Sequence, residues 1–239
     1  VTIRRITQRR TNTPSGANGL SKALATVEEA LCQVASLLEG AGIEQPRHEA
    51  RILLGHVTGL TRERLLLYHR SEIEELVLND LIGLARRRAA REPIAYLIGE
   101  REFWGLSFEV TRDTLIPRPD SETLIEAVLH FTNRTGQERP NILDFGIGSG
   151  CLLVSLLTEM PFAEGFGVDL NFAALRIARR NAARHGVSAR AHFFVGSWGD
   201  AVDPPFDLII ANPLYVAAGE RAAIMPDVRE YEPAEALFA

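Results

Sequence analysis

The sequence predicts an α/β protein in which a small helical-bundle domain precedes a domain built on a parallel β-sheet. Three observations support this fold class. Up to about residue 91, apolar residues recur at three- and four-residue steps, which is typical of amphipathic helices. Later, short apolar strands alternate with helices, which favours a parallel sheet covered on both faces. A glycine-alternating loop joins the first of these strands to its helix, whose start offers unpaired N–H groups to a ligand.

The composition restricts the classes to which the chain can belong. Its 239 residues, 46% of them hydrophobic, are enough for one large or two smaller cores. The two cysteines and the scattered histidines offer neither a disulfide framework nor a zinc motif, so no metal is expected. No apolar run follows the N-terminal arginines, so neither a signal peptide nor a membrane anchor is predicted. The default location is a reducing cytoplasm.

The net charge of −5 is unevenly spread along the chain. Residues 1–27 contain basic side chains and no acid, so the remainder carries an acidic excess. We interpret residues 1–20 as a basic leader that is solvated and disordered, although a basic end can also touch nucleic acid or a ribosome.

Residues 21–92 are predicted to form the helical bundle, a domain suited to substrate recognition. The expected helices end at Gly40, run from Pro46 to Gly59, span residues 61–68, and run from a cap at Ser71 into the basic residues 86–88. Pro93 is expected to stop the helices. Residues 93–120 then combine a hairpin around Gly105 with the rigid stretch Ile116-Pro117-Arg118-Pro119.

Residues 121–239 are predicted to form the sheet domain. Ser121 is expected to cap its first helix, which ends near Phe131. The predicted strands cover residues 141–145, 165–169, 191–195 and 206–211, and the predicted helices cover 151–159 and 171–185. The chain ends at Ala239, shortly after the fourth strand, so this domain is expected to be incomplete at its C-terminus.

The loop after the first predicted strand carries an acid followed by alternating glycines. A dinucleotide fingerprint spaces its glycines G-x-G-x-x-G instead. A carboxylate before the glycines would receive the amino group of an amino-acid-like ligand and repel a pyrophosphate, and an acid at the end of the second strand can accept both ribose hydroxyls. We therefore predict that S-adenosylmethionine, rather than NAD, binds at Asp144, Gly146, Ile147, Gly148, Ser149, Gly150 and Asp169. The alternative is that both acids are ordinary strand-end caps.

Trp198 follows the third predicted strand, in the region where an adenine edge would lie. Because an indole can stack on a base, we count Trp198 among the candidate cofactor-binding residues. An ordinary core or surface tryptophan is an equally good interpretation of the residue type alone.

The fourth strand ends in Asn212-Pro213-Leu214-Tyr215, which we take as the candidate catalytic and substrate-binding segment. An amide or ring-amine nitrogen has a delocalised lone pair and attacks a methyl donor poorly. The side-chain oxygen of Asn212 and the backbone carbonyl of Pro213 can accept its N–H hydrogens and orient it. Tyr215 can pack on the planar group, and Asn212 also lies beside the cofactor.

Over residues 21–239 the chain resembles the release-factor glutamine methyltransferases. Asn-Pro-Pro-Tyr marks methyltransferases that act on planar nitrogens, and the family's other segments match residues 91–99, 102–105, 115–122, 144–150 and 228–237. The resemblance implies a class I S-adenosylmethionine-dependent methyltransferase domain. It also implies methyl transfer to the side-chain amide nitrogen (N5) of the glutamine in the Gly-Gly-Gln loop of peptide chain release factors. The helical domain would help to dock the factor, and residues 212–215 would grip the glutamine.

Two departures from the family pattern bear on activity. Leu214 stands where the family has a second proline, so Pro213 loses the conformational bias that a following proline imposes. The family's domain continues with further strands, so we expect either a fragment of a longer protein or a degraded copy with an open sheet edge.

Two other functions stay open on sequence alone. An adenine-N6 methyltransferase acting on DNA or RNA shares the Asn-Pro-x-Tyr pattern, but the acidic excess of residues 28–239 disfavours a nucleic-acid partner. A catalytically impaired homologue that still binds cofactor or release factor would follow from Leu214 and the missing strands. We expect a protein partner, and neither nucleic acid nor membrane.

Overall fold

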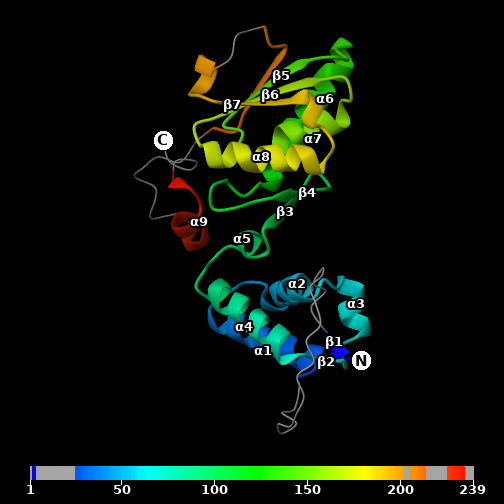
Figure 1. The fold of residues 1–239 in the computed structure, drawn as a ribbon, viewed down its shortest axis with the longest axis vertical. Helices are drawn as coiled ribbons and strands as arrows, with labels where there is room; N and C mark the ends of the chain where they lie inside the picture. Colours follow the sequence, from blue (N-terminus) through cyan, green and yellow to red (C-terminus); the bar gives the residue numbers. More distant parts are fainter. Residues whose placement is uncertain (1, 4–24, 202–204, 214–224, 235–239) are drawn as a thin grey trace, which may run out of the picture. The chain divides into compact units, whose positions relative to one another are not determined.

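The computed structural model describes residues 2–3, 25–201, 205–213 and 225–234, which belong to two compact units that divide between Ile98 and Gly99 (Figure 1). Most of the expected leader, together with Leu214 and Tyr215, lies outside the described residues. The first described residues form β1 (Thr2–Ile3), which pairs in parallel with β2 (Glu72–Ile73). These two residues of the expected leader therefore take part in the helical unit.

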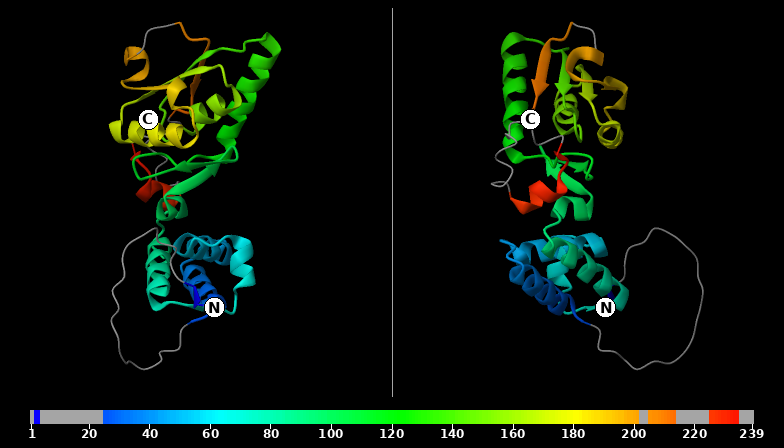
Figure 2. Two further views of the ribbon diagram at one scale, coloured as in Figure 1. Left: turned by 45° about the vertical axis from the view of Figure 1, so that its right-hand side comes forward. Right: turned by 90° about the vertical axis from the view of Figure 1, so that its left-hand side faces the viewer.

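The first unit is a helical bundle, as the apolar periodicity predicts. Its helices are α1 (Val27–Gly40), α2 (Pro46–Thr58), α3 (Arg62–Leu67), α4 (Glu75–Ala89) and α5 (Ile94–Ile98). Helices α1, α2 and α4 pack on one another around side chains that are fully buried, among them Leu38, Leu53 and Leu81 (Figures 1 and 2). Within the described ranges, no helix has the length and apolar character needed to cross a bilayer.

The ends of two helices differ from the sequence-based expectation. Ser71 does not cap α4: the two residues that follow it are extended as β2, and the N-cap of α4 is Glu74. The extended conformation lets the backbone N–H of Ile73 donate to Ala25 at 2.8 Å and buries the Ile73 side chain completely. Hydrogen bonding and burial together outweigh the capping preference of the serine.

Pro93 does not end the helical unit but precedes α5. A proline has no N–H to satisfy, so it is tolerated where a helix begins. Helix α5 buries Leu97 in the core of the helical unit. For this reason the division between the units falls after Ile98, whereas the sequence pattern places it at residue 92.

The second unit combines a hairpin with a parallel sheet. The hairpin pairs β3 (Glu100–Phe103) with β4 (Leu106–Glu109). The sheet contains β5 (Asn141–Phe145), β6 (Glu164–Asp169), β7 (Ala191–Val195) and β8 (Leu208–Ala211), and its helices are α6 (Glu122–Thr135), α7 (Cys151–Glu159), α8 (Phe172–Arg184) and α9 (Pro226–Tyr231). All pairings between the four strands are parallel, so the predicted fold class is confirmed.

The strand order β7-β6-β5-β8 determines where a ligand can bind. The chain adds β6 and then β7 on one side of β5, and returns to place β8 on the other side (Figure 1). The order therefore reverses between β5 and β8, and in such sheets ligands bind at the carboxyl ends of the strands beside the reversal. Phe145 pairs with Ala211 at this edge, so the glycine loop and Asn212 leave neighbouring strands at the same level.

Two glycines of β6 allow the sheet and its helix to approach closely. A Cβ on Gly165 would lie 2.8 Å from Leu157 Cδ1 and 2.9 Å from Leu153 Cδ1, and both leucines of α7 are fully buried. A Cβ on Gly167 would lie 2.7 Å from Ile147 Cδ1, in the loop after β5. The close approach positions both α7 and that loop.

We expect Gly165→Ala to destabilise the second unit by about 1–3 kcal/mol, because the added methyl group would force two fully buried side chains, Leu153 and Leu157, to shift within the core. Urea unfolding followed by tryptophan fluorescence measures the change, since both tryptophans belong to this unit. Gly199→Ala is the control: a Cβ there meets nothing within 4 Å, so its effect should stay below about 0.5 kcal/mol. Equal effects of the two substitutions would contradict the packing argument.

Candidate active site

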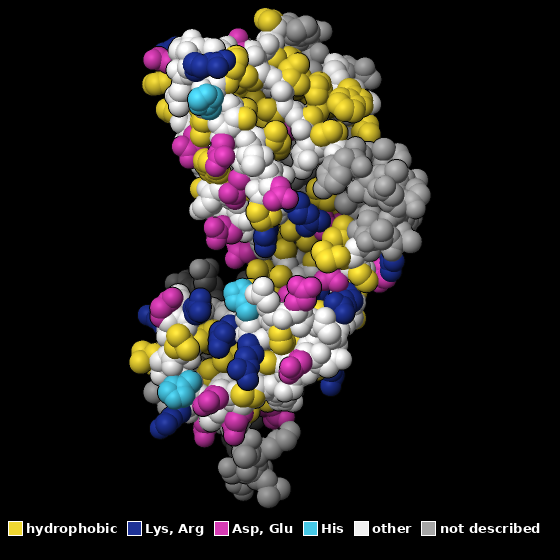
Figure 3. Space-filling model, turned by 180° about the vertical axis from the view of Figure 1, so that it is seen from behind, with side chains coloured by type: hydrophobic (Ala, Val, Ile, Leu, Met, Phe, Trp, Pro, Cys, Tyr) yellow, Lys and Arg dark blue, Asp and Glu magenta, His cyan; other side chains and the backbone are white. Residues whose placement is uncertain are grey.

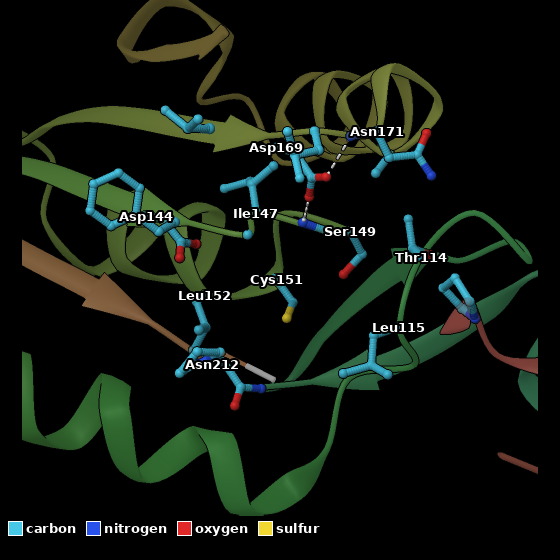
Figure 4. Close-up of a pocket in the computed structure, with 18 of the residues that line it drawn as sticks. Thr114, Leu115, Asp144, Ile147, Ser149, Cys151, Leu152, Asp169, Asn171 and Asn212 are labelled. Carbon is cyan, nitrogen blue, oxygen red and sulfur yellow. Dashed lines mark hydrogen bonds between the residues drawn. The ribbon is translucent and has the colours of Figure 1, made fainter. Parts of the chain in front are cut away.

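A cavity of about 620 Å³ lies at the carboxyl edge of the sheet. Its walls come from the segments that follow β5, β6, β7 and β8 and from the extended stretch before α6. Figure 4 shows that Asp144, Asp169 and Asn212 project from three different strands toward this one space. The structure thus brings together all the predicted cofactor residues except Gly150 and the first two residues of the predicted catalytic segment.

The glycines of the loop after β5 have two different roles. All three have positive φ angles, 70° at Gly146, 52° at Gly148 and 81° at Gly150, which side chains strongly disfavour. A Cβ on Gly146 would meet nothing within 4 Å, so that backbone is open to a ligand. On Gly150 a Cβ would lie 3.1 Å from Ala178 Cβ in α8, and Gly150 is not among the described cavity-lining residues. Gly150 therefore serves helix packing.

Asp144 carries an unpartnered oxygen atom in a buried position. Its side chain is 1% exposed, and Oδ1 has no hydrogen-bond partner within the described part of the chain. Burial, together with the charge of Asp169, raises the pKa of Asp144 to about 8. A buried carboxyl oxygen without a partner is costly, so this atom indicates that the site is completed by a positively charged or hydrogen-bond-donating ligand.

The carboxylate of Asp169 already holds two backbone segments in place. Its Oδ2 accepts from the N–H of Gly148 at 2.9 Å, and its Oδ1 accepts from the N–H of Asn171 at 2.8 Å (Figure 4). A carboxylate has about four acceptor positions, so capacity is left for ligand hydroxyls. Asp169 therefore links the glycine loop to the start of α8 as well as lining the cavity.

Trp198 lines the cavity with an exposed side chain in a strained backbone conformation. Its φ angle is 48°, a region that non-glycine residues rarely occupy, and it is 63% exposed. The indole ring lies 5.5 Å from the ring of Phe145, centroid to centroid. Such a conformation keeps an aromatic face at the cavity wall, as stacking on a base requires.

Asn212 and Pro213 follow β8 directly and both line the cavity. Asn212 Nδ2 donates a hydrogen bond to Ser121 Oγ at 3.2 Å. Ser121 is the N-cap residue of α6, as expected, but it also ends a 3-10 turn (Pro119–Ser121) that continues into the helix, and its side chain makes no capping bond. The last two residues of the predicted segment, Leu214 and Tyr215, lie outside the described residues.

The Ile-Pro-Arg-Pro stretch is held by a buried acid from the far end of the chain. Glu232 Oε1 accepts from Arg118 Nη2 at 2.5 Å, and Oε2 accepts from the N–H of Ile116 at 3.1 Å. The Glu232 side chain is 1% exposed, and the next residue, Pro233, lines the cavity. Arg118 thus has a protein carboxylate as its partner, and this partner anchors the segment after α9 beside the site.

Asn181 is a structural residue of the site that sequence reasoning missed. It is completely buried in α8, where Nδ2 donates to the carbonyls of Ser149 at 2.8 Å and Glu109 at 3.0 Å. Oδ1 accepts from the N–H of Glu109 at 2.8 Å. The bonds tie the glycine loop to the hairpin. The sequence does hold a signal, because Asn181 is a polar residue on the apolar face formed by Ala174, Ile177 and Ala178.

The residues that line the cavity fit a ligand with both an ammonium group and a nucleoside. The unpaired oxygen of Asp144 suits the ammonium, the open backbone at Gly146 permits close approach, and Trp198 offers a stacking face. Burial raises the pKa of the Cys151 thiol at the cavity wall to about 12, so this sulfur is not a thiolate nucleophile near neutral pH. The site therefore suits binding and orientation more than covalent catalysis.

The parallel sheet with a cavity at its carboxyl edge is the architecture of a methyltransferase domain, and comparison with known proteins shows the family. Residues 121–227 match the family described as methyltransferase small domain, and residues 29–99 match the family described as PrmC N-terminal domain. The chain belongs to the release factor glutamine methyltransferase family. It is 43% identical over 200 residues to the protein of that name from Rhodospirillum rubrum, covering 84% of this chain and 61% of that protein. The corresponding protein of Cereibacter sphaeroides is 42% identical over 209 residues, covering 87% of this chain and 73% of that protein.

We expect the affinity for S-adenosylmethionine, the ligand predicted from the sequence, to rise between about pH 6 and pH 8. The pKa of Asp144 is raised to about 8, so the free carboxyl group is protonated over most of this range. A bound ammonium group favours the carboxylate, and binding must therefore release a proton. Isothermal titration calorimetry in two buffers of different ionisation enthalpy measures the release.

Asp144→Asn is the control for this linkage. It keeps the shape of the side chain but has no proton to lose. Binding to the variant should be weaker, with no proton release from this position. A proton release that is unchanged in Asp144→Asn would contradict the assignment.

Asn181→Asp should destabilise the second unit by about 3 kcal/mol, because it removes both Nδ2 donors and places a carboxylate against two carbonyls. The same substitution at Asn171, the N-cap of α8, is the matched control, since its Oδ1 accepts from the N–H of Ala173 and aspartate caps equally well. Its Nδ2 loses only an exposed bond of 3.3 Å to the carbonyl of Asp113. Thermal unfolding compares the two variants. Similar losses at both positions would refute a special role for Asn181.

Proposed function

We propose that this chain transfers a methyl group from S-adenosylmethionine to the side-chain amide nitrogen of a glutamine in peptide chain release factors. The family membership supports the reaction class, and the curated relatives carry this activity in their names. The chain spans 61% of the length of the first of these relatives. We therefore propose its own activity and its protein partner by analogy with them.

One observation carries the proposal: Asn212 and Pro213 line the same cavity as the glycine loop and Asp144. Strands β5 and β8 are hydrogen-bonded neighbours, and both segments leave them at the same edge of the sheet. A group held by Asn212 is therefore beside a ligand held by the loop. The reaction needs this proximity, because much of its barrier is the cost of aligning the nitrogen with the methyl group.

The residues of this chain act by binding and orientation. Asn212 Oδ1 and the Pro213 carbonyl accept the two N–H hydrogens of the glutamine amide, which fixes its plane and increases electron density on nitrogen. S-adenosylmethionine, when bound, would supply an electrophilic methyl group on sulfur, and the amide nitrogen that takes the methyl group would lose one proton to solvent. Asp144 holds the ammonium end of the donor, and Asp169 its ribose hydroxyls.

The competing proposal is adenine-N6 methylation of a nucleic acid. Proteins that bind nucleic acid concentrate Lys and Arg in a stripe along the bound backbone. On the face drawn in Figure 3, acidic and basic side chains of the described residues are interspersed over both units. This mixed charge favours a protein substrate.

The test is methyl transfer from labelled S-adenosylmethionine to a purified release factor. We expect labelling of the factor and none of an adenine-containing DNA or RNA oligomer. Replacement of the acceptor glutamine in the Gly-Gly-Gln loop should abolish labelling, and Asn212→Ala should lower kcat by about 10²-fold or more, since it removes an orienting acceptor. Labelling of the oligomer alone would overturn the proposal.

The substitution Leu214→Pro distinguishes two causes of low activity: poor positioning of the substrate by residues 212–215, and a wrongly assigned function. The substitution restores the restriction on Pro213 without changing either acceptor. If Leu214 weakens the site, Leu214→Pro should raise kcat and leave the dissociation constant of S-adenosylmethionine unchanged. Cofactor binding without transfer in both forms would favour a catalytically impaired binder.

A further inference from the structure

We infer that Ser121 is a positioning residue for methyl transfer, which orients the carboxamide of Asn212 through the hydrogen bond from Asn212 Nδ2 to Ser121 Oγ. The inference rests on the proposed function, because it assigns a task to the amide that grips the substrate. It assigns a role to a residue at the start of α6, which lines the cavity together with the segments that follow the strands.

The Ser121 hydroxyl is available for this task because it is not used by its own helix. A serine at a helix start normally accepts from a backbone N–H two or three residues later. Ser121 makes no such bond, since its φ and ψ of −70° and −13° already place it in a helical turn. The neighbouring Thr123 hydroxyl binds the carbonyl of Asp120 instead. Ser121 is 9% exposed, and among the described residues its side chain hydrogen-bonds to the amide of Asn212.

A carboxamide at this position needs an orienting partner. The terminal torsion of asparagine is broad, and the oxygen and NH₂ ends can exchange places with little intrinsic cost. The two ends are chemically opposite toward a glutamine amide, because only the oxygen can accept its N–H. With Nδ2 bound to Ser121, Oδ1 of Asn212 has no protein partner among the described residues and stays available as the acceptor.

The bond also joins two elements that are far apart in sequence. Ser121 follows the Ile-Pro-Arg-Pro stretch, which Glu232 holds through Arg118 and the N–H of Ile116. Asn212 ends β8, the strand beside the glycine loop. The rigid stretch thus provides a fixed reference for Asn212, and its two prolines limit the movement of Ser121. The residues that fix the orientation of the Asn212 side chain therefore lie outside the parallel sheet.

The experiment compares Ser121→Thr with Ser121→Val, which differ by a hydroxyl at nearly equal volume. We expect Ser121→Val to lower kcat for release-factor methylation about tenfold or more, with little change in the affinity for S-adenosylmethionine, because misplacement of an orienting group affects mainly the chemical step. Ser121→Thr should retain most of the activity. Thr123→Val is the control for loss of a hydroxyl on the same helix away from Asn212. If Val is too bulky to fold, Ser121→Ala gives the same comparison.

A second measurement reads the hydrogen bond itself. The side-chain NH₂ signals of Asn212, assigned by their absence in Asn212→Ala, should move upfield in Ser121→Val and stay near their original positions in Ser121→Thr. Equal kcat and equal amide signals in these two variants would overturn the inference. If the unmodified chain transfers no methyl group, the proposed function fails, and the amide signals alone then decide whether Ser121 orients Asn212.

Discussion

The pairing of β8 against β5 is the constraint on which the site depends. Hydrogen bonds between parallel strands fix the register in which Phe145 lies opposite Ala211. A shift of one residue would turn each β8 side chain to the other face of the sheet and move Asn212 away from the glycine loop. The reversal of strand order at this pair leaves room above the sheet edge. This one pairing therefore places both candidate segments, the glycine loop and Asn212, at the same cavity.

Buried polar groups then convert this edge into a defined site. The side-chain nitrogen and oxygen atoms of Asn181 and Glu232 all have hydrogen-bond partners. These bonds tie the glycine loop and the Ile-Pro-Arg-Pro stretch to segments that are distant in sequence. Asp144 is the opposite case, since its burial leaves Oδ1 unpartnered and raises the pKa of the carboxyl group to about 8. Such an unfavourable buried group is expected where a ligand completes a site.

Sequence patterns predicted the fold wherever one local rule dominated. The bounds of β5, α7 and β7 agree with the predicted ranges, because apolar runs and glycine stops coincide there. Prediction was wrong where tertiary contacts compete with a local preference. Ser71 does not cap α4, because Ile73 pairs in an extended conformation. Ser121 does take the N-cap position of α6, but its hydroxyl accepts from Asn212 instead of from the helix backbone. Asn181 was overlooked because helical periodicity treats a buried face as uniformly apolar.

By itself, the sequence determined the parallel α/β class and pointed to the glycine loop, the strand-end acids and Asn212 as candidate site residues, which line one cavity in the structure. Spacing along one chain is enough for these features, since glycine alternation and strand-end acids are local. Only the tertiary structure decided that Gly150 packs on Ala178, that Arg118 forms an ion pair with Glu232, and that Ser121 contacts Asn212. Each of these facts joins residues that are far apart in sequence. Such contacts depend on how the strands and helices are placed in space, which no local pattern encodes.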